Sequence, residues 1–127
     1  MVETALLTSD IDTGKRVIGA LDAESADLRS ALWLYIPDSS EWRLVLSLPA
    51  VDREGLRAGY RLVQRALAKH RVDLLLRRID VMGVAEPLAR RLRRYLRTPA
   101  NGTSDITIQS ESVDGYLIEG AHVYRST

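Results

Sequence analysis

Hydrophobic positions recur along this chain with two periods, one typical of helices and one typical of strands. The helical period predicts three helices, over residues 9–24, 52–70 and 87–98. Pro87 suits the first turn of the third helix, and Pro99 stops it because proline cannot continue a helical backbone. In the second helix, one apolar stripe combines residues spaced by three, four or seven positions: Leu56, Tyr60, Val63 and Leu67.

Strand-like alternation first appears over residues 30–49, where two apolar runs flank the sequence Pro-Asp-Ser-Ser. This arrangement predicts a β-hairpin. In its first strand, Trp33 and Tyr35 point to the face opposite Leu32, Leu34 and Ile36. One face of the hairpin is expected in the core. The face that carries Trp33 and Tyr35 is expected to be partly exposed or a contact surface.

A second hairpin is predicted over residues 104–125, because Asp114-Gly115 lies between two alternating runs. This dipeptide is a strong signal for a two-residue hairpin turn. Such a turn determines which residues face each other across the two strands: Ile108 with Ala121, and Ile106 with Val123.

One further strand is expected over residues 72–83, an aliphatic run that is too short for a helix between two better ones. The resulting order is helix, strand, strand, helix, strand, helix, strand, strand. It predicts a single α+β domain over residues 1–127. We expect a mainly antiparallel sheet of about five strands, with two to three helices packed on one face.

Two runs within this pattern also resemble known proteins. The sequences ALWLYIPDSSEWRLVLSLPAVD (31–52) and VDGYLIEGAHVYR (113–125) are similar to small stand-alone bacterial α+β proteins that have no assigned function. The resemblance extends over most of the chain. It implies no activity, ligand or catalytic residue, so the residues themselves must indicate the function.

The composition excludes several kinds of chemistry. The chain has no cysteine, which rules out disulfides, thiolate metal sites and cysteine nucleophiles. His70 and His122 belong to no metal-binding motif, and Asp10 and Asp12 suit the start of a helix better than a phosphate- or metal-binding loop. We therefore expect no catalytic residue, cofactor or metal site. The N-terminal residues carry no secretion signal and no apolar run could cross a membrane, so we expect a cytoplasmic protein.

Charge is distributed unevenly, although the net charge is only +1. Residues 51–100 contain thirteen basic and five acidic side chains, whereas both flanking segments are acidic overall. The 52–70 helix carries a basic row at intervals of four: Arg57, Arg61, Arg65 and Lys69. The next helix places five arginines opposite its apolar side: Arg90, Arg91, Arg93, Arg94 and Arg97. Such rows are usually solvated, but like charges this close repel, so an acidic or phosphate group is expected nearby.

Two functions compete on these observations, and an enzyme ranks third because no motif supports one. The first is a non-catalytic interaction module: an adaptor, a regulatory or immunity-type subunit, or a homodimer. Its candidate contact residues are Trp33, Tyr35, Arg57, Arg61, Arg65, Arg90, Arg94 and Arg97. The alternative is a nucleic-acid-binding protein that contacts phosphates through the same arginines. The near-neutral charge and the absence of a base-reading motif favour the first, and predict weak, sequence-independent nucleic-acid binding.

Overall fold

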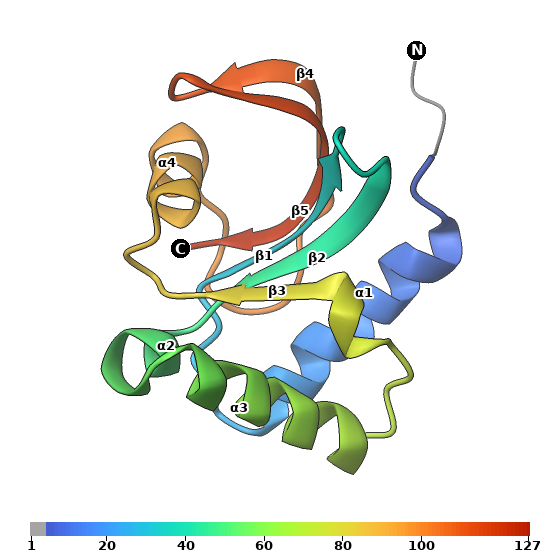
Figure 1. Cartoon of the computed structure of the whole chain (residues 1–127), viewed down its shortest axis with the longest axis vertical. Helices are drawn as coiled ribbons and strands as arrows, with labels where there is room; N and C mark the ends of the chain where they lie inside the picture. Colours follow the sequence, from blue (N-terminus) through green and yellow to red (C-terminus); the bar gives the residue numbers. More distant parts are fainter. Residues whose placement is uncertain (1–4) are drawn as a thin grey trace.

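The fold is given by a computed structural model that describes residues 5–127 (Figure 1). A five-stranded sheet forms its centre, and helices lie on both sides of the sheet. The strands are β1 (Ser30–Ile36), β2 (Glu41–Ser47), β3 (Ile79–Met82), β4 (Ile106–Val113) and β5 (Tyr116–Ser126). The helices are α1 (Thr8–Ala23), α2 (Pro49–Glu54), α3 (Leu56–Lys69) and α4 (Pro87–Tyr95), with a short 3-10 turn, η1 (Leu76–Arg78), before β3.

The strands lie in the order β3-β2-β1-β5-β4. Three of the four strand pairings are antiparallel, and the pairing of β2 with β3 is parallel. The parallel pair arises because α2 and α3 carry the chain from the end of β2 back to the start of β3. The predicted, mainly antiparallel sheet of five strands is therefore confirmed. The order of elements differs from the prediction by the additional helix α2 and the turn η1.

The C-terminal hairpin has the predicted register. Ile106 lies opposite Val123, and Ile108 lies opposite Ala121. The turn Asp114-Gly115 has φ angles of 50° and 81°. Positive φ at both central positions matches the twist of a two-residue hairpin, so the local sequence is sufficient to set this pairing.

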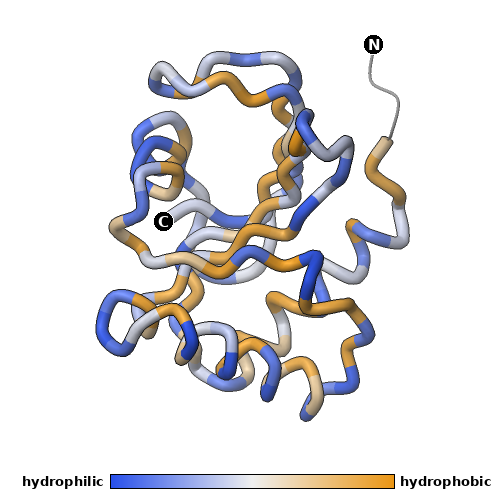
Figure 2. Tube along the Cα trace, viewed as in Figure 1, coloured by the Kyte–Doolittle hydropathy of each residue, from blue (hydrophilic) through white to orange (hydrophobic). Residues whose placement is uncertain are grey.

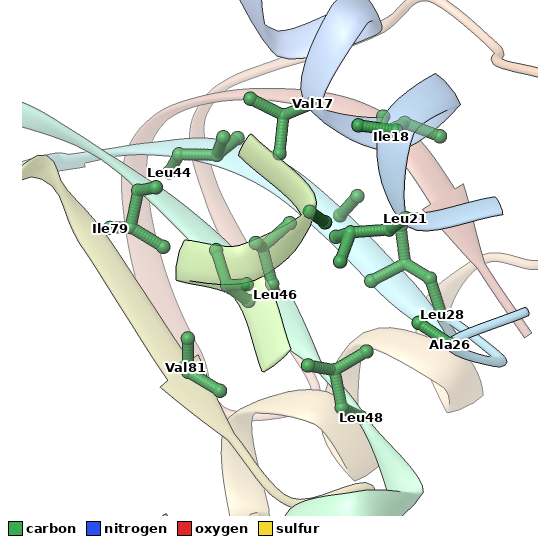
Figure 3. Packing of buried hydrophobic residues seen from close by; sticks show 14 of the residues in the cluster. Val17, Ile18, Leu21, Ala26, Leu28, Leu44, Leu46, Leu48, Ile79 and Val81 are labelled. Carbon is green, nitrogen blue, oxygen red and sulfur yellow. The ribbon is translucent and has the colours of Figure 1, made fainter. Parts of the chain in front are cut away.

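One face of the sheet is covered by α1 and α3, which form a hydrophobic core with it. Figure 3 shows Val17, Ile18 and Leu21 of α1 in the same core as Leu44 and Leu46 of β2. All five of these side chains are buried. Complete burial of such a side chain contributes about 1.5–3 kcal/mol, so the apolar stripes of the helices decide which side faces the sheet.

The opposite face of the sheet is covered by α4 and by the tip of the β4–β5 hairpin. Leu92 of α4 is fully buried there, in a core that includes Leu32, Val113 and Ile118. The hairpin bends near Ser110, whose φ of 48° is left-handed, and its tip curls over α4 (Figure 1). The prediction that the helices pack on one face only is wrong, because both faces of β1 are apolar and each requires a cover.

Gly55 divides the predicted 52–70 helix into α2 and α3. Its φ of 98° is readily adopted by glycine and interrupts the helical hydrogen bonding. Asp52 of α2 then accepts hydrogen bonds from the backbone N–H groups of Val84 at 2.7 Å and Ala85 at 3.3 Å. These hydrogen bonds connect α2 to the loop before α4.

Two other elements are shorter than the sequence predicts. The strand expected over residues 72–83 is confined to the four residues of β3. Only these four residues pair with β2, and they pair with the last four residues of β2. The helix expected over residues 87–98 ends at Tyr95, and Leu96 is already extended.

Figure 2 shows hydrophobic positions concentrated along the central strands and hydrophilic positions along the outer turns of the helices.

Candidate functional site

The arginines of α3 form an exposed cationic surface. Arg57, Arg61 and Arg65 are all exposed, and none of them forms an ion pair or a hydrogen bond with another residue in the range 5–127. The helix itself contains no acidic residue. Lys69, at the end of the row, differs because it pairs with Glu24 at 3.2 Å. Arg57, Arg61 and Arg65 are called the α3 arginine surface below.

The arginines of α4 are largely engaged by the protein itself. Arg94 pairs with Asp114 at the tip of the β4–β5 hairpin. Arg93 donates a hydrogen bond of 3.0 Å to a backbone carbonyl in the loop before the helix. The guanidinium carbon of Arg91 lies 5.9 Å from the centre of the Tyr116 ring, which suits a cation–π contact. The bent hairpin thus supplies a carboxylate and an aromatic ring that offset the positive charge of this helix.

Arg90 and Arg97 are exposed, and they and Arg29 lie close enough to Arg93 to influence its charge. Arg29 precedes β1, and backbone pairing at the end of β5 connects that segment with the one that follows α4. Burial lowers the pKa of Arg93, and the neighbouring Arg97, Arg29 and Arg90 lower it further. The sequence analysis missed Arg29 because it is a lone arginine far from α4 in the chain. It also has a partner of its own, Asp27, at 3.0 Å.

The helices α3 and α4 lie on opposite faces of the sheet (Figure 1). The predicted arginines therefore form two separate surfaces, one with Arg57, Arg61 and Arg65 and the other with Arg90, Arg94 and Arg97. Only the set on α3 has no internal partner at any of its three positions, as judged over the part of the chain that the structure describes.

Trp33 and Tyr35 are buried, with exposed fractions of 0% and 6%. The indole N–H of Trp33 donates to the backbone carbonyl of Asp10 at 3.1 Å. Helix α1 can lie this close because Gly14 has no side chain, and a Cβ there would be 2.8 Å from the indole nitrogen. The expectation of an exposed aromatic surface is therefore wrong: α1 covers Trp33, and Tyr35 packs against the ring of Trp42.

The acidic start of α1 has a different role from the one that the sequence suggests. No side chain caps the helix, and Asp10 pairs with Arg78 at 3.0 Å. The guanidinium of Arg78 also lies 4.9 Å from the centre of the Trp33 ring. The capping role predicted for Asp10 is wrong, because an arginine that is distant in sequence takes its carboxylate. Both histidines also pair with carboxylates: His70 with Glu24 at 2.8 Å, and His122 with Asp105 at 3.0 Å.

Features that would indicate other kinds of site are absent from the described part of the chain. Within residues 5–127, no group of three or more His, Asp or Glu side chains is placed to hold a metal ion. Among the helices of that same range, none has the length and apolar character needed to cross a membrane. No protein-family model, curated protein or solved structure matches the chain. The geometry of the arginines is accordingly the observation from which a function can be proposed.

Proposed function

We propose that this protein is a non-catalytic interaction module that docks an acidic surface of a partner protein on α3. The proposal is carried by the α3 arginine surface, in which three exposed cations lie along one helix that has no acid of its own. Like charges at this spacing repel by a few tenths of a kcal/mol per pair. An acidic partner would relieve that repulsion on binding and would accelerate the encounter.

An exposed leucine beside the α3 arginine surface supports a protein partner. Leu56 belongs to the predicted apolar stripe of its helix, yet it is 53% exposed in the fold. It directly precedes Arg57, so an apolar group and a cationic row are presented together. Protein interfaces commonly combine an apolar centre with a polar rim, which matches this arrangement.

Nucleic-acid binding is the alternative, and the placement of the arginines favours it less. A phosphate backbone is best followed by a continuous basic track, whereas the arginines of α3 and α4 lie on opposite faces of the sheet. Proteins that bind single strands also stack bases on accessible aromatic rings, whereas the aromatic residue of α3, Tyr60, is packed against the core and hydrogen-bonded to β3. We therefore expect any nucleic-acid binding to be weak and independent of sequence.

The proposal is tested with two triple variants that change the net charge equally. The first replaces the three residues of the α3 arginine surface by Glu, and the control replaces three other exposed arginines by Glu: Arg77, Arg90 and Arg97. Fluorescence anisotropy at physiological salt measures the binding of a labelled glutamate-rich peptide and of a labelled DNA single strand. We expect tighter binding of the peptide, which weakens at least about tenfold in the α3 variant and less than about twofold in the control.

Two results would contradict this proposal. An equal loss of peptide binding in both variants would show that net charge alone is responsible. Tighter binding of the DNA strand that depends on α3 would establish the alternative function instead. Circular dichroism of both variants checks the fold, which we expect to be intact because the substituted side chains are exposed.

Self-association as a homodimer remains a prediction. Its basis in the sequence is an apolar sheet face left open, but in the fold both faces are covered. The large apolar side chains that are exposed come from separate elements and include Leu7, Leu56, Leu75 and Leu117. Light scattering at tens of micromolar protein measures the mass. A mass of two subunits would support the homodimer, and a mass of one subunit would contradict it.

A further inference from the structure

A cavity of about 500 Å³ lies beside the bend of the β4–β5 hairpin. None of its lining residues belongs to α3. The bend near Ser110 turns the tip of the hairpin toward α4, on the face of the sheet opposite α1. The cavity lies between this bend, the start of α1 and the β1–β2 hairpin. Sites for small molecules typically have volumes of about 300–1,000 Å³, so this cavity could hold a compact ligand.

The wall formed by the β1–β2 hairpin is aromatic. Tyr35 and Trp42 both line the cavity, and their ring centres are 5.4 Å apart with the planes tilted by 58°. Ile11 and Ile108 add aliphatic surface to the lining. The faces of aromatic rings are electron-rich and attract cations, most strongly where water is excluded.

The charged groups at the cavity are acidic on balance. Glu119 lines it and forms no ion pair or hydrogen bond with the rest of the described chain. Two cationic or basic side chains are also close, but each is held by Asp105: Lys15 at 3.5 Å and His122 at 3.0 Å. The carboxylate of Glu119 is therefore the charge that remains for a ligand.

Acidic residues also surround a buried tyrosine next to the cavity. The ring of Tyr124 packs edge-on against His122, a lining residue, with 5.0 Å between ring centres. Burial is the main factor that raises the pKa of Tyr124, and a hydrogen bond with Trp33 opposes it. The charges of nearby aspartates raise the pKa further: Asp105, Asp12 and Asp10. The groups around the Tyr124 ring therefore disfavour a further negative charge there.

We propose that this cavity binds a small organic cation, with a protonated amine at Glu119 and an aromatic or aliphatic body against Tyr35 and Trp42. The apolar wall would contact the aromatic or aliphatic body of such a molecule. The carboxylate would form an ion pair with its protonated amine. The inference is independent of the proposed partner-binding function, because the two surfaces share no residue.

The test uses two probes with similar bodies and opposite charges, phenethylamine and 3-phenylpropionate. Titrations followed by NMR monitor the indole N–H of Trp42 and the side-chain amide of Gln109, which both line the cavity. We expect phenethylamine to shift these signals and to bind at least about tenfold more tightly than 3-phenylpropionate. Glu119→Gln should reduce that preference several-fold. Asp38→Asn, which removes an exposed acid from the β1–β2 turn, should leave it unchanged.

A variant that blocks the cavity tests whether the probes bind there or elsewhere on the surface. Thr107 is exposed and lines the cavity, so Thr107→Trp should fill it and abolish the binding of both probes. Glutamate at the three positions of the α3 arginine surface should leave amine binding unchanged, so failure of one proposal is distinguishable from failure of the other. The cation site is refuted by equal affinity for the two probes, by an unchanged preference in Glu119→Gln, or by no shift at about 10 mM amine.

Discussion

Arg125 of β5 donates two parallel hydrogen bonds to the carboxylate of Asp22 in α1, at 2.9 and 2.8 Å. The side chain of Arg125 is only 2% exposed, and its guanidinium also donates to the carbonyl of Gly102 at 2.7 Å. This pair connects the last strand of the fold to the first helix. The loop around Gly102 is attached to the same point, so one guanidinium holds three segments together.

We predict that Asp22→Ala lowers the free energy of unfolding by about 2 kcal/mol, because a buried guanidinium loses its carboxylate. Asp22 itself is partly exposed, which keeps the effect below that of a fully buried pair. Urea denaturation measures the change. Asp38→Ala is the control, and an equal effect of both substitutions would show that the Arg125 pair contributes nothing specific.

A second prediction compares two glycines of α1. Gly14→Ala should destabilise the fold by about 1–3 kcal/mol, because its Cβ would overlap the Tyr124 hydroxyl and crowd the Trp33 indole. Gly19→Ala should instead stabilise the fold by up to about 1 kcal/mol, because Gly19 is exposed and a Cβ there meets no neighbour within 4 Å. Thermal melts of both variants measure these opposite signs. Equal effects at the two positions would contradict the close approach of α1 to the sheet.

The pair of Glu24 with His70 and Lys69 predicts a dependence of stability on pH. Hydrogen bonds from His70 and Lys69 lower the pKa of Glu24 below its ordinary value of 4.5. A carboxylate with a lowered pKa stabilises the fold above 4.5, and this contribution is lost as the pH falls through the lowered value. The melting temperature should therefore be higher for the parent than for Glu24→Gln at pH 7. The two should converge in strong acid, whereas Glu54→Gln, at an exposed glutamate, should match the parent throughout.

The arginines in α4 and just after it should differ in their tolerance to charge reversal. Arg94→Glu removes the pair with Asp114 and places two like charges together, so it should cost about 0.5–1 kcal/mol, as expected for an exposed pair. Arg90→Glu and Arg97→Glu should leave the free energy of unfolding nearly unchanged or raise it. Both arginines are exposed, and both repel the like charge of Arg93. Chemical denaturation of the three single variants measures the difference. A larger loss at Arg90 or Arg97 than at Arg94 would contradict the assigned contacts.

Part of the candidate surface could be predicted from the sequence. Arg57, Arg61 and Arg65 lie on one side of an amphipathic helix, and their exposure follows from the apolar stripe opposite them. Leu56, the first residue of α3, lies on the same stripe but is 53% exposed, which the periodicity alone does not show. The pairing of Arg94 with Asp114 depends on a hairpin that curls over α4, which no local pattern reveals.

The sequence by itself determined the C-terminal hairpin down to its register. The turn Asp114-Gly115 and the alternation beside it act over a few residues, and their conformational preferences need no distant partner. Only the tertiary structure decided that Trp33 and Tyr35 are buried, because periodicity shows which side chains share a face but not what covers that face. Both faces of β1 are apolar, so the choice of cover depends on which helix can approach, and that in turn depends on contacts between segments far apart in the chain.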